Sequence, residues 1–116
     1  MADVLLVEDD EDLAYLIDRT LSGDGHQVSR EGTVTGALAA LDATEFDVVV
    51  TDLGLPDASG VAVCEAGRDR GVPVVVITAN ERLRVIPAVS ECARVVISKP
   101  FALDELTAAV GDAAAA

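Results

Sequence analysis

The stretch VVVTDLGLP, residues 48–56, decides the fold class of this chain. It opens with three successive valines, a pattern typical of a strand that is buried on both faces. An acidic residue, Asp52, closes this strand, and Gly54 and Pro56 then mark a turn. Continuous apolar runs of the same kind occur at residues 4–7, 74–77 and 95–97. Because helices cover both faces of parallel sheets, these runs predict an α/β fold.

The segments between these runs have the spacing of amphipathic helices, with apolar residues three and four apart in residues 13–21, 34–41 and 103–110. Thr33 is the expected N-cap of the second of these helices. A more polar strand, Gln27–Glu31, suits the edge of a sheet. Five strands alternating with helices predict a single doubly wound (βα)5 domain over residues 1–116. If the polar strand is outermost, the parallel sheet fits the order 2-1-3-4-5, which is one of the two common orders of doubly wound sheets and is expected here by that likeness.

Two of the expected helices are irregular. The third, residues 60–70, is short and contains Gly67. The fourth, between residues 80 and 92, contains Pro87, which cannot donate a hydrogen bond inside a helix. We therefore expect the fourth helix either to begin late or to be kinked.

The composition excludes several classes of function. With 21 acidic and 8 basic residues, the net charge is −13, and a field of that sign repels nucleic acid phosphates. No apolar run approaches the roughly 18 residues of a membrane span. The first residues lack the basic region and cleavage site of a signal peptide. We expect a soluble, cytoplasmic domain that contacts no membrane and binds no nucleic acid directly.

The two cysteines, Cys64 and Cys92, lie far apart in the sequence and form no C-x-x-C pair. A free cysteine behaves as a small apolar residue and is often buried. We therefore expect two buried free thiols, with a redox role as the alternative.

Reactive side chains close four of the five predicted strands. Glu8-Asp9-Asp10 follow the first strand, Asp52 ends the third, Thr78 ends the fourth and Lys99 follows the fifth. Ligands of an open parallel sheet bind beyond the carboxyl ends of its strands. Lys99 is the only lysine of the chain, the other seven basic residues being arginines. We expect these groups to converge at one end of the sheet.

Such a cluster has a definite chemistry. Close carboxylates repel each other by about 4 kcal/mol per pair at an effective dielectric constant near 20. A divalent cation removes that repulsion, and Mg²⁺ prefers oxygen ligands. A carboxylate beside Mg²⁺ can attack phosphorus to form an acyl phosphate. The Lys99 ammonium and the Thr78 hydroxyl would stabilise the phosphoryl oxygens. For Glu8-Asp9-Asp10, the alternative is an acidic helix cap, a role that Asp10 or Glu11 fills best.

The sequence resembles the receiver domains of two-component response regulators, over essentially the whole chain. The matching pieces are LVEDD at residues 6–10, VTDLGLP at 50–56, Gly60, ITA at 77–79 and SKPF at 98–101. The resemblance implies a flavodoxin-like fold and a phosphoacceptor, Asp52. It implies Mg²⁺ held by Asp9, by Glu8 through water, by Asp52 and by the Gly54 carbonyl. Thr78 and Lys99 would contact the phosphoryl group, and Lys99-Pro100 would be a cis peptide bond.

The resemblance also implies partners. A histidine kinase or a histidine phosphotransfer protein would supply the phosphoryl group, and an output domain or effector protein would respond to it. A phosphorylation-dependent homodimer stays open. The domain would catalyse only its own phosphorylation and dephosphorylation, and would not be an enzyme in the usual sense. Phosphorylation would act on the fourth helix, fifth strand and fifth helix, the segments into which Thr78 and Lys99 lead.

The chain departs from the family pattern in three places. Val96 stands where the family usually has an aromatic residue. The stretch between Asp52 and Thr78 is about four residues shorter than usual, close to one helical turn. Gly54 and Asn80 occupy positions that tune the lifetime of the phosphoryl group.

Three alternatives remain at this point. A degenerate receiver would share the fold and serve only protein–protein contact. A phosphatase that turns over an aspartyl phosphate would need a second acid at position 54, where Gly54 stands. A flavodoxin-type electron carrier is disfavoured by the scarcity of aromatic residues and by the absence of a phosphate-binding loop.

Asp57, Ser59 and Gly60 are interpreted as a simple loop.

Overall fold

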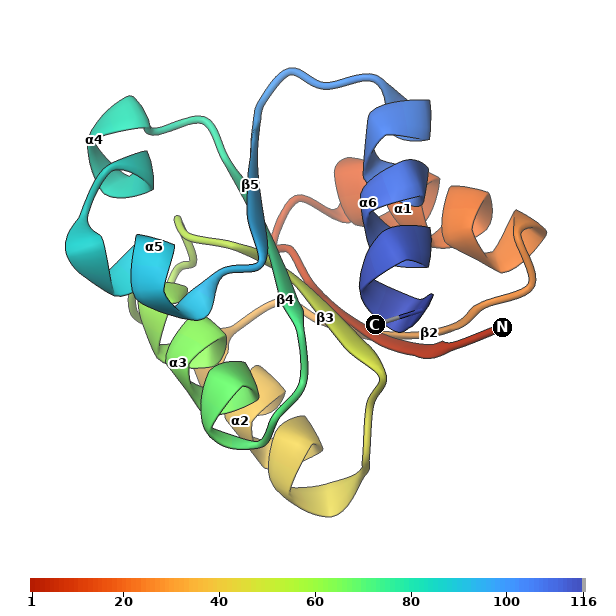
Figure 1. Ribbon diagram of the computed structural model, residues 1–116, viewed down its shortest axis with the longest axis horizontal. Coiled ribbons are helices and arrows are strands. Elements are labelled where there is room, and N and C mark those ends of the chain that lie inside the picture. Colours follow the sequence, from red (N-terminus) through yellow and green to blue (C-terminus); the bar gives the residue numbers. More distant parts are fainter. Residues whose placement is uncertain (116) are drawn as a thin grey trace.

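The computed structural model describes residues 1–115 and contains one parallel five-stranded sheet (Figure 1). Its strand order is β2-β1-β3-β4-β5, which confirms the predicted order 2-1-3-4-5 and the doubly wound fold. The strands are β1 Asp3–Val7, β2 Gln27–Glu31, β3 Val48–Asp52, β4 Val74–Thr78 and β5 Val95–Ser98. The polar strand β2 lies at the edge beside β1, as its composition predicts.

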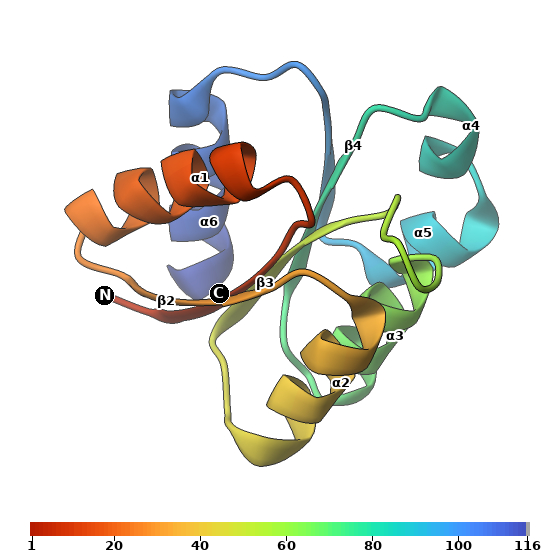
Figure 2. The ribbon, with the colours of Figure 1, turned by 180° about the vertical axis from the view of Figure 1, so that it is seen from behind.

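Helices cover both faces of the sheet (Figures 1 and 2). The helices are α1 Glu11–Gly23, α2 Val34–Ala43, α3 Val61–Asp69, α4 Glu81–Arg84, α5 Pro87–Cys92 and α6 Leu103–Ala115. Helices α1 and α6 lie on one face, whereas α2, α3 and α5 lie on the other.

Alternate strand residues feed two separate cores. In β1, Val4 and Leu6 belong to the core under α1 and α6, whereas Leu5 and Val7 belong to the core under α2, α3 and α5. Successive side chains of a strand point to opposite faces, so a strand covered on both sides must be apolar throughout. All residues of β3 and β4 are buried. This arrangement leaves the strand ends as the place for polar groups.

Two helix starts follow the expected capping chemistry. The Asp10 carboxylate accepts from the N–H groups of Asp12 and Leu13 and caps α1, and Thr33 caps α2 through its bond from the Gly36 N–H. The cap at Asp10 turns the chain directly from the end of β1 into α1, which places Glu8 and Asp9 at the strand terminus.

The expected fourth helix is divided into two short helices. Helix α4 ends at Arg84, and Pro87 then occupies the first turn of α5. Proline is tolerated there because the N–H it lacks would have no partner within the helix. The expectation of a late start or a kink was therefore close, but the chain makes a complete break. The third helix, Val61–Asp69, is short as predicted.

The prediction of two free thiols was wrong, because Cys64 and Cys92 form a disulfide. Cys64 lies in α3 and Cys92 ends α5, and these two helices pack side by side on one face of the sheet. Their Cα atoms are 5.7 Å apart although 28 positions separate them in the sequence. The burial of both side chains was predicted correctly, but the contact depends on tertiary packing that spacing does not reveal.

Candidate functional site

The predicted reactive residues meet at the carboxyl end of the sheet. Glu8 and Asp9 follow β1, Asp52 ends β3, Thr78 ends β4 and Lys99 follows β5. Strand β3 lies between β1 and β4, and β5 lies beyond β4. Because the strands are parallel, all four ends open on the same edge of the sheet, which is why residues far apart in the sequence become neighbours.

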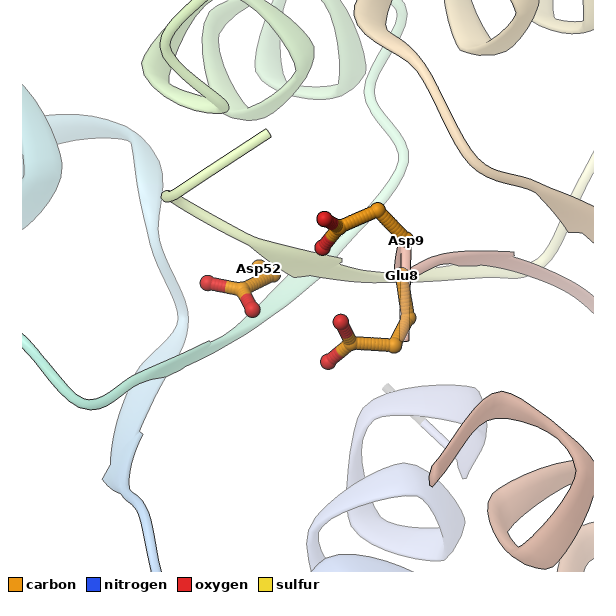
Figure 3. A group of neighbouring side chains, drawn as sticks. All are labelled: Glu8, Asp9 and Asp52. Carbon is orange, nitrogen blue, oxygen red and sulfur yellow. The ribbon is translucent and has the colours of Figure 1, made fainter. Parts of the chain in front are cut away.

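Three carboxylates form one cluster. Glu8, Asp9 and Asp52 each offer an oxygen, and these atoms all lie within 4.8 Å of one another. Figure 3 shows the three side chains facing a common space beyond the ends of β1 and β3. Glu8 and Asp52 are buried, with 4% and 7% of their surface exposed, whereas Asp9 is exposed. Asp9 is therefore the most exposed of the three carboxylates.

Lys99 links two of these carboxylates. Its ammonium donates to Glu8 Oε1 over 2.8 Å and to Asp52 Oδ2 over 2.6 Å. Burial lowers the pKa of Lys99, but the hydrogen bonds to Asp52 and Glu8 outweigh burial and leave that pKa above its ordinary value. The ammonium is thus charged throughout the neutral range and offsets part of the negative charge of the cluster.

Glu8 shows the opposite balance. Burial raises the pKa of the Glu8 carboxyl, and this outweighs the bonds from the Lys99 ammonium and from the Asp10 N–H that lower it. The Asp52 carboxylate adds a further repulsion. A second positive charge at this point would therefore stabilise the ionised form of Glu8.

Backbone N–H groups orient the two buried carboxylates. Asp10 N–H donates to Glu8 Oε2 over 3.1 Å, and Gly54 N–H donates to Asp52 Oδ1 over 3.0 Å. Each oxygen of Asp52 thus has one donor, Gly54 on one side and Lys99 on the other. This arrangement holds the Asp52 side chain in one orientation toward the open side of the cluster.

Thr78 is buried at the end of β4, and its hydroxyl bonds to the backbone two residues further along the chain and to none of the three carboxylates described above. Its hydroxyl oxygen accepts from the Asn80 N–H over 3.0 Å, and Asn80 in turn caps α4 through its side-chain oxygen. The Thr78 hydroxyl proton remains available for another acceptor. The Lys99-Pro100 peptide bond is cis, as the resemblance implies. Val96 is half-buried and packs against the core under α5.

Asp57 has a positioning role that sequence reasoning missed. Its carboxylate accepts from Val34 N–H over 2.8 Å, from Thr35 N–H over 3.0 Å and from the Thr35 hydroxyl over 2.9 Å. These bonds lower the pKa of Asp57 to about 2. They attach the loop that carries Gly54 to the start of α2. No local signal predicts them, because the partners lie 22 and 23 positions apart.

Position 60, at the end of the loop after β3, requires a glycine for steric reasons. A Cβ atom here would overlap the carbonyl oxygen of Asp52 and would lie 2.8 Å from the Leu53 Cα. The Gly60 N–H donates to the Leu53 carbonyl over 2.9 Å, so the chain folds back closely on the end of β3. The loop after the strand is therefore compact, and only a residue without a side chain allows it.

The chain is similar to two groups of transcriptional regulators. It is 38% identical over 109 residues to the DNA-binding response regulator MtrA of Mycobacterium tuberculosis, covering 92% of this chain and 48% of MtrA. It is 33% identical over 109 residues to the transcriptional regulatory protein KdpE of Staphylococcus aureus, covering 92% of this chain and 47% of KdpE. The chain thus spans about half the length of the curated relatives it matches.

Solved structures support the fold. A CheY-like response regulator receiver domain protein from Methanospirillum hungatei superposes with a TM-score of 0.92 at 22% identity, covering 99% of this chain and 94% of that one. A response regulator structure from Chloroflexus aurantiacus superposes with a TM-score of 0.88 at 27% identity, covering 99% of this chain and 98% of that one. The first likeness concerns the fold alone, because the identity is low.

A family comparison covers nearly the whole chain. The sequence model of the response regulator receiver domain matches residues 4–111, from the second residue of β1 to within α6. This range includes every strand end described above. The match, the fold and the relatives agree with the resemblance drawn from the sequence motifs. The chain belongs to the response regulator receiver domain family.

Proposed function

We propose that Asp52 accepts the phosphoryl group of a two-component signalling system, and that residues 1–116 form the receiver unit. The observation that carries the proposal is the placement of the Lys99 ammonium 2.6 Å from the Asp52 carboxylate, within a cluster that also contains Glu8 and Asp9. A buried nucleophile, a fixed cation and further acidic ligands in one place are what phosphoryl transfer to a carboxylate requires.

The donor set of the cluster fits Mg²⁺. Every atom that it offers is a carboxylate oxygen, and hard divalent cations prefer oxygen ligands. Asp9 and Asp52 would hold the ion directly, Glu8 would act through water, and the Gly54 carbonyl would complete the protein ligands. When bound, Mg²⁺ would supply positive charge between the acidic side chains and the phosphoryl oxygens.

The residues of the chain would then act as follows. An Asp52 oxygen forms a bond to phosphorus while the bond from phosphorus to the donor breaks. The Lys99 ammonium, already beside Asp52, pairs with a phosphoryl oxygen. The Thr78 hydroxyl donates its proton to another phosphoryl oxygen, because its present bond uses only its lone pair. Both contacts would shift the segments that follow β4 and β5, because Thr78 ends β4 and Lys99 follows β5.

A phosphodonor assay tests this proposal. The chain, incubated with Mg²⁺ and acetyl phosphate, should gain the mass of one phosphoryl group, and chelation of the metal should prevent that gain. Asp52→Asn should abolish uptake without unfolding the domain. Asp24→Asn, at an exposed position outside the cluster, is the matched control and should behave as the wild type. Unchanged uptake by Asp52→Asn, or no uptake by the wild type, would contradict the proposal.

Response regulators work with histidine kinases and output domains. For this chain, a histidine kinase or histidine phosphotransfer protein as donor, and an output domain or effector as recipient, are part of the proposal. So are a cytoplasmic location and a phosphorylation-dependent homodimer. No helix among residues 1–115 is long and apolar enough to cross a membrane. The net charge of −13 repels DNA phosphates, so we propose that residues 1–116 do not contact DNA directly.

A degenerate receiver is the second candidate function. Val96 favours it, because the half-buried valine supplies no aromatic ring to move with Thr78. The phosphodonor assay separates the two functions, since a degenerate domain would take up no phosphoryl group. Gly54 offers no side chain for acid–base chemistry, so we expect no turnover of other phosphate esters.

A further inference from the structure

The disulfide between Cys64 and Cys92 joins two helices that the proposed phosphoryl chemistry does not use. We propose that these cysteines form a reversible thiol–disulfide site, and that its oxidation state sets how freely residues 81–92 move on the sheet. The proposal goes beyond phosphoryl acceptance and does not depend on it.

The two cysteines are placed for pairing by the fold itself. Helices α3 and α5 pack against each other over the same core, and the Cα separation of 5.7 Å lies in the usual range for a disulfide. Cys64 is fully buried in the centre of α3, whereas Cys92 ends α5 with 7% of its surface exposed. The pair therefore has one inner sulfur and one that lies nearer the surface.

Cys92 borders an open surface cavity of about 470 Å³. The cavity wall includes the side chains of Arg68 and Arg94, each of which also pairs with a neighbouring carboxylate, Asp69 and Asp112 respectively. Among residues 1–115, no acidic residue lines the cavity, although the chain has 21 of them. Reactive cysteines sit in partly exposed places near cationic side chains. Of the two sulfurs, that of Cys92 is therefore the one that we expect a small disulfide or thiol reagent to attack.

A low-molecular-weight disulfide can serve as the oxidant that converts the two cysteine thiols into the disulfide. The Cys92 thiolate attacks one sulfur of that disulfide, and the first thiolate of the reagent leaves. The Cys64 thiolate then attacks the Cys92 sulfur, and the second thiolate leaves. The protein loses two protons and two electrons in total, and the reagent takes them up as two thiols. Reduction by a dithiol reverses both steps.

Closure of the bond would act on the segment from α4 to α5. Helix α4 buries none of its four residues, and α5 buries only Val89 and Cys92. Leu83 and Ile86 are only partly buried against the core, so this part of the chain is expected to open more easily than the fully buried strands. A covalent bond from Cys92 to the centre of α3 removes that freedom at the C-terminal end of the segment. Helix α4 begins three residues after Thr78, so the effect extends to the neighbourhood of the site.

The bond itself is tested first, on the wild-type chain without any phosphodonor. The chain is equilibrated with reduced and oxidised glutathione at a series of ratios, quenched by acid and alkylated. We expect a reversible change in which the intact mass falls by the two lost hydrogens and a peptide linking Cys64 to Cys92 appears. If only mixed disulfides with glutathione form, or if both thiols stay free at every ratio, the proposal is overturned.

The motion is tested by hydrogen exchange of the same two forms. The amides of residues 81–92 should exchange at least about tenfold faster in the reduced chain than in the oxidised chain, while those of β1 and β3 stay alike. Equal exchange in the two forms would overturn the proposal even if the bond forms.

Two variants serve as controls. The double variant Cys64→Ala/Cys92→Ala should exchange as the reduced chain does, whatever the glutathione ratio. Cys92→Ala keeps one thiol and should show no difference between the two conditions. Since none of these measurements uses Mg²⁺ or a phosphoryl group, failure of uptake at Asp52 leaves their outcome unaffected, and the two proposals can fail separately.

Discussion

At the scale of single residues, Lys99 determines the electrostatic character of the site. Two buried carboxylates, those of Glu8 and Asp52, share its ammonium. Hydrogen bonds of this kind between ionised groups are stronger than neutral ones, and loss of one partner leaves the other buried and unpaired. The only lysine of the chain therefore supports the fold as well as the proposed chemistry.

Lys99→Ala should lower the free energy of unfolding by about 1–3 kcal/mol near pH 8, because the carboxylates of Glu8 and Asp52 lose their cation. The loss should be smaller near pH 5, where Glu8, whose pKa burial already raises, can take up a proton. Urea unfolding at the two pH values measures the difference. Arg82→Ala removes an equal charge at an exposed position and should change little. A loss that does not depend on pH would contradict this explanation.

At the scale of elements, two contacts hold the loop between β3 and α3 in place, one at its end and one at its middle. Gly60 allows the loop to fold closely against Asp52, and Asp57 attaches its middle to the start of α2. Gly54, earlier in the same loop, donates to Asp52. The position of the proposed metal ligand thus depends on a helix that contributes no group to the cluster itself.

Asp57→Asn should reduce stability at neutral pH and flatten its dependence on acid. The pKa of Asp57 is about 2 in the folded chain against an ordinary value of 3.8, so the folded state binds its proton less tightly than the unfolded state does. The stability that this group adds is complete above its ordinary pKa and is lost as the pH falls toward 2. Thermal unfolding from neutral pH downward measures it. Glu45→Gln, at an exposed position, should retain the wild-type acid dependence.

Two glycines should respond in opposite ways to alanine. Gly60→Ala forces a Cβ against the Asp52 carbonyl and should cost about 1–3 kcal/mol of unfolding free energy. Gly111→Ala lies within α6, where the added Cβ would meet no atom within 4 Å beyond the neighbouring backbone of its own helix, and it should gain about 0.5–1 kcal/mol through helix propensity. Denaturant midpoints of the two variants provide the comparison. A neutral Gly60→Ala would show that the loop can shift away from β3.

At the scale of the whole molecule, two helical layers and a parallel sheet form two cores, and the disulfide crosses only one of them. That core lies under α2, α3 and α5, and meets the segment of α4 and α5, in which Val89 and Cys92 are the buried residues. The other core, under α1 and α6, has no covalent bond across it and depends on apolar packing alone among the described residues.

Reduction of the disulfide should lower the free energy of unfolding by about 3–4 kcal/mol, the chain-entropy value for a loop of this length. Its two cysteines are 28 positions apart, so the bond restricts a sizeable part of the unfolded chain. Urea unfolding of the oxidised and reduced forms measures the effect. The double variant Cys64→Ala/Cys92→Ala should not respond to reductant. Equal stability of the oxidised and reduced wild-type chains would contradict the prediction.

The apolar runs and helical spacing of the sequence predicted the buried strands and the convergence of Glu8, Asp9, Asp52, Thr78 and Lys99, whereas the strand order came from the likeness to a known fold and from the polar edge strand. These features were predictable because each follows from periodicity within one element and from the rule that parallel strands end at one edge. Even the irregular fourth helix was visible in Pro87, although its complete division into α4 and α5 was not.

Only the tertiary structure decided which side chains pair across elements. The bond between Cys64 and Cys92, the attachment of Asp57 to α2 and the sharing of Lys99 between Glu8 and Asp52 all join residues more than 20 positions apart. Such contacts depend on how helices pack on a sheet and on which rotamers the neighbours leave free. Periodicity reports which face of an element is buried, but not what that face meets.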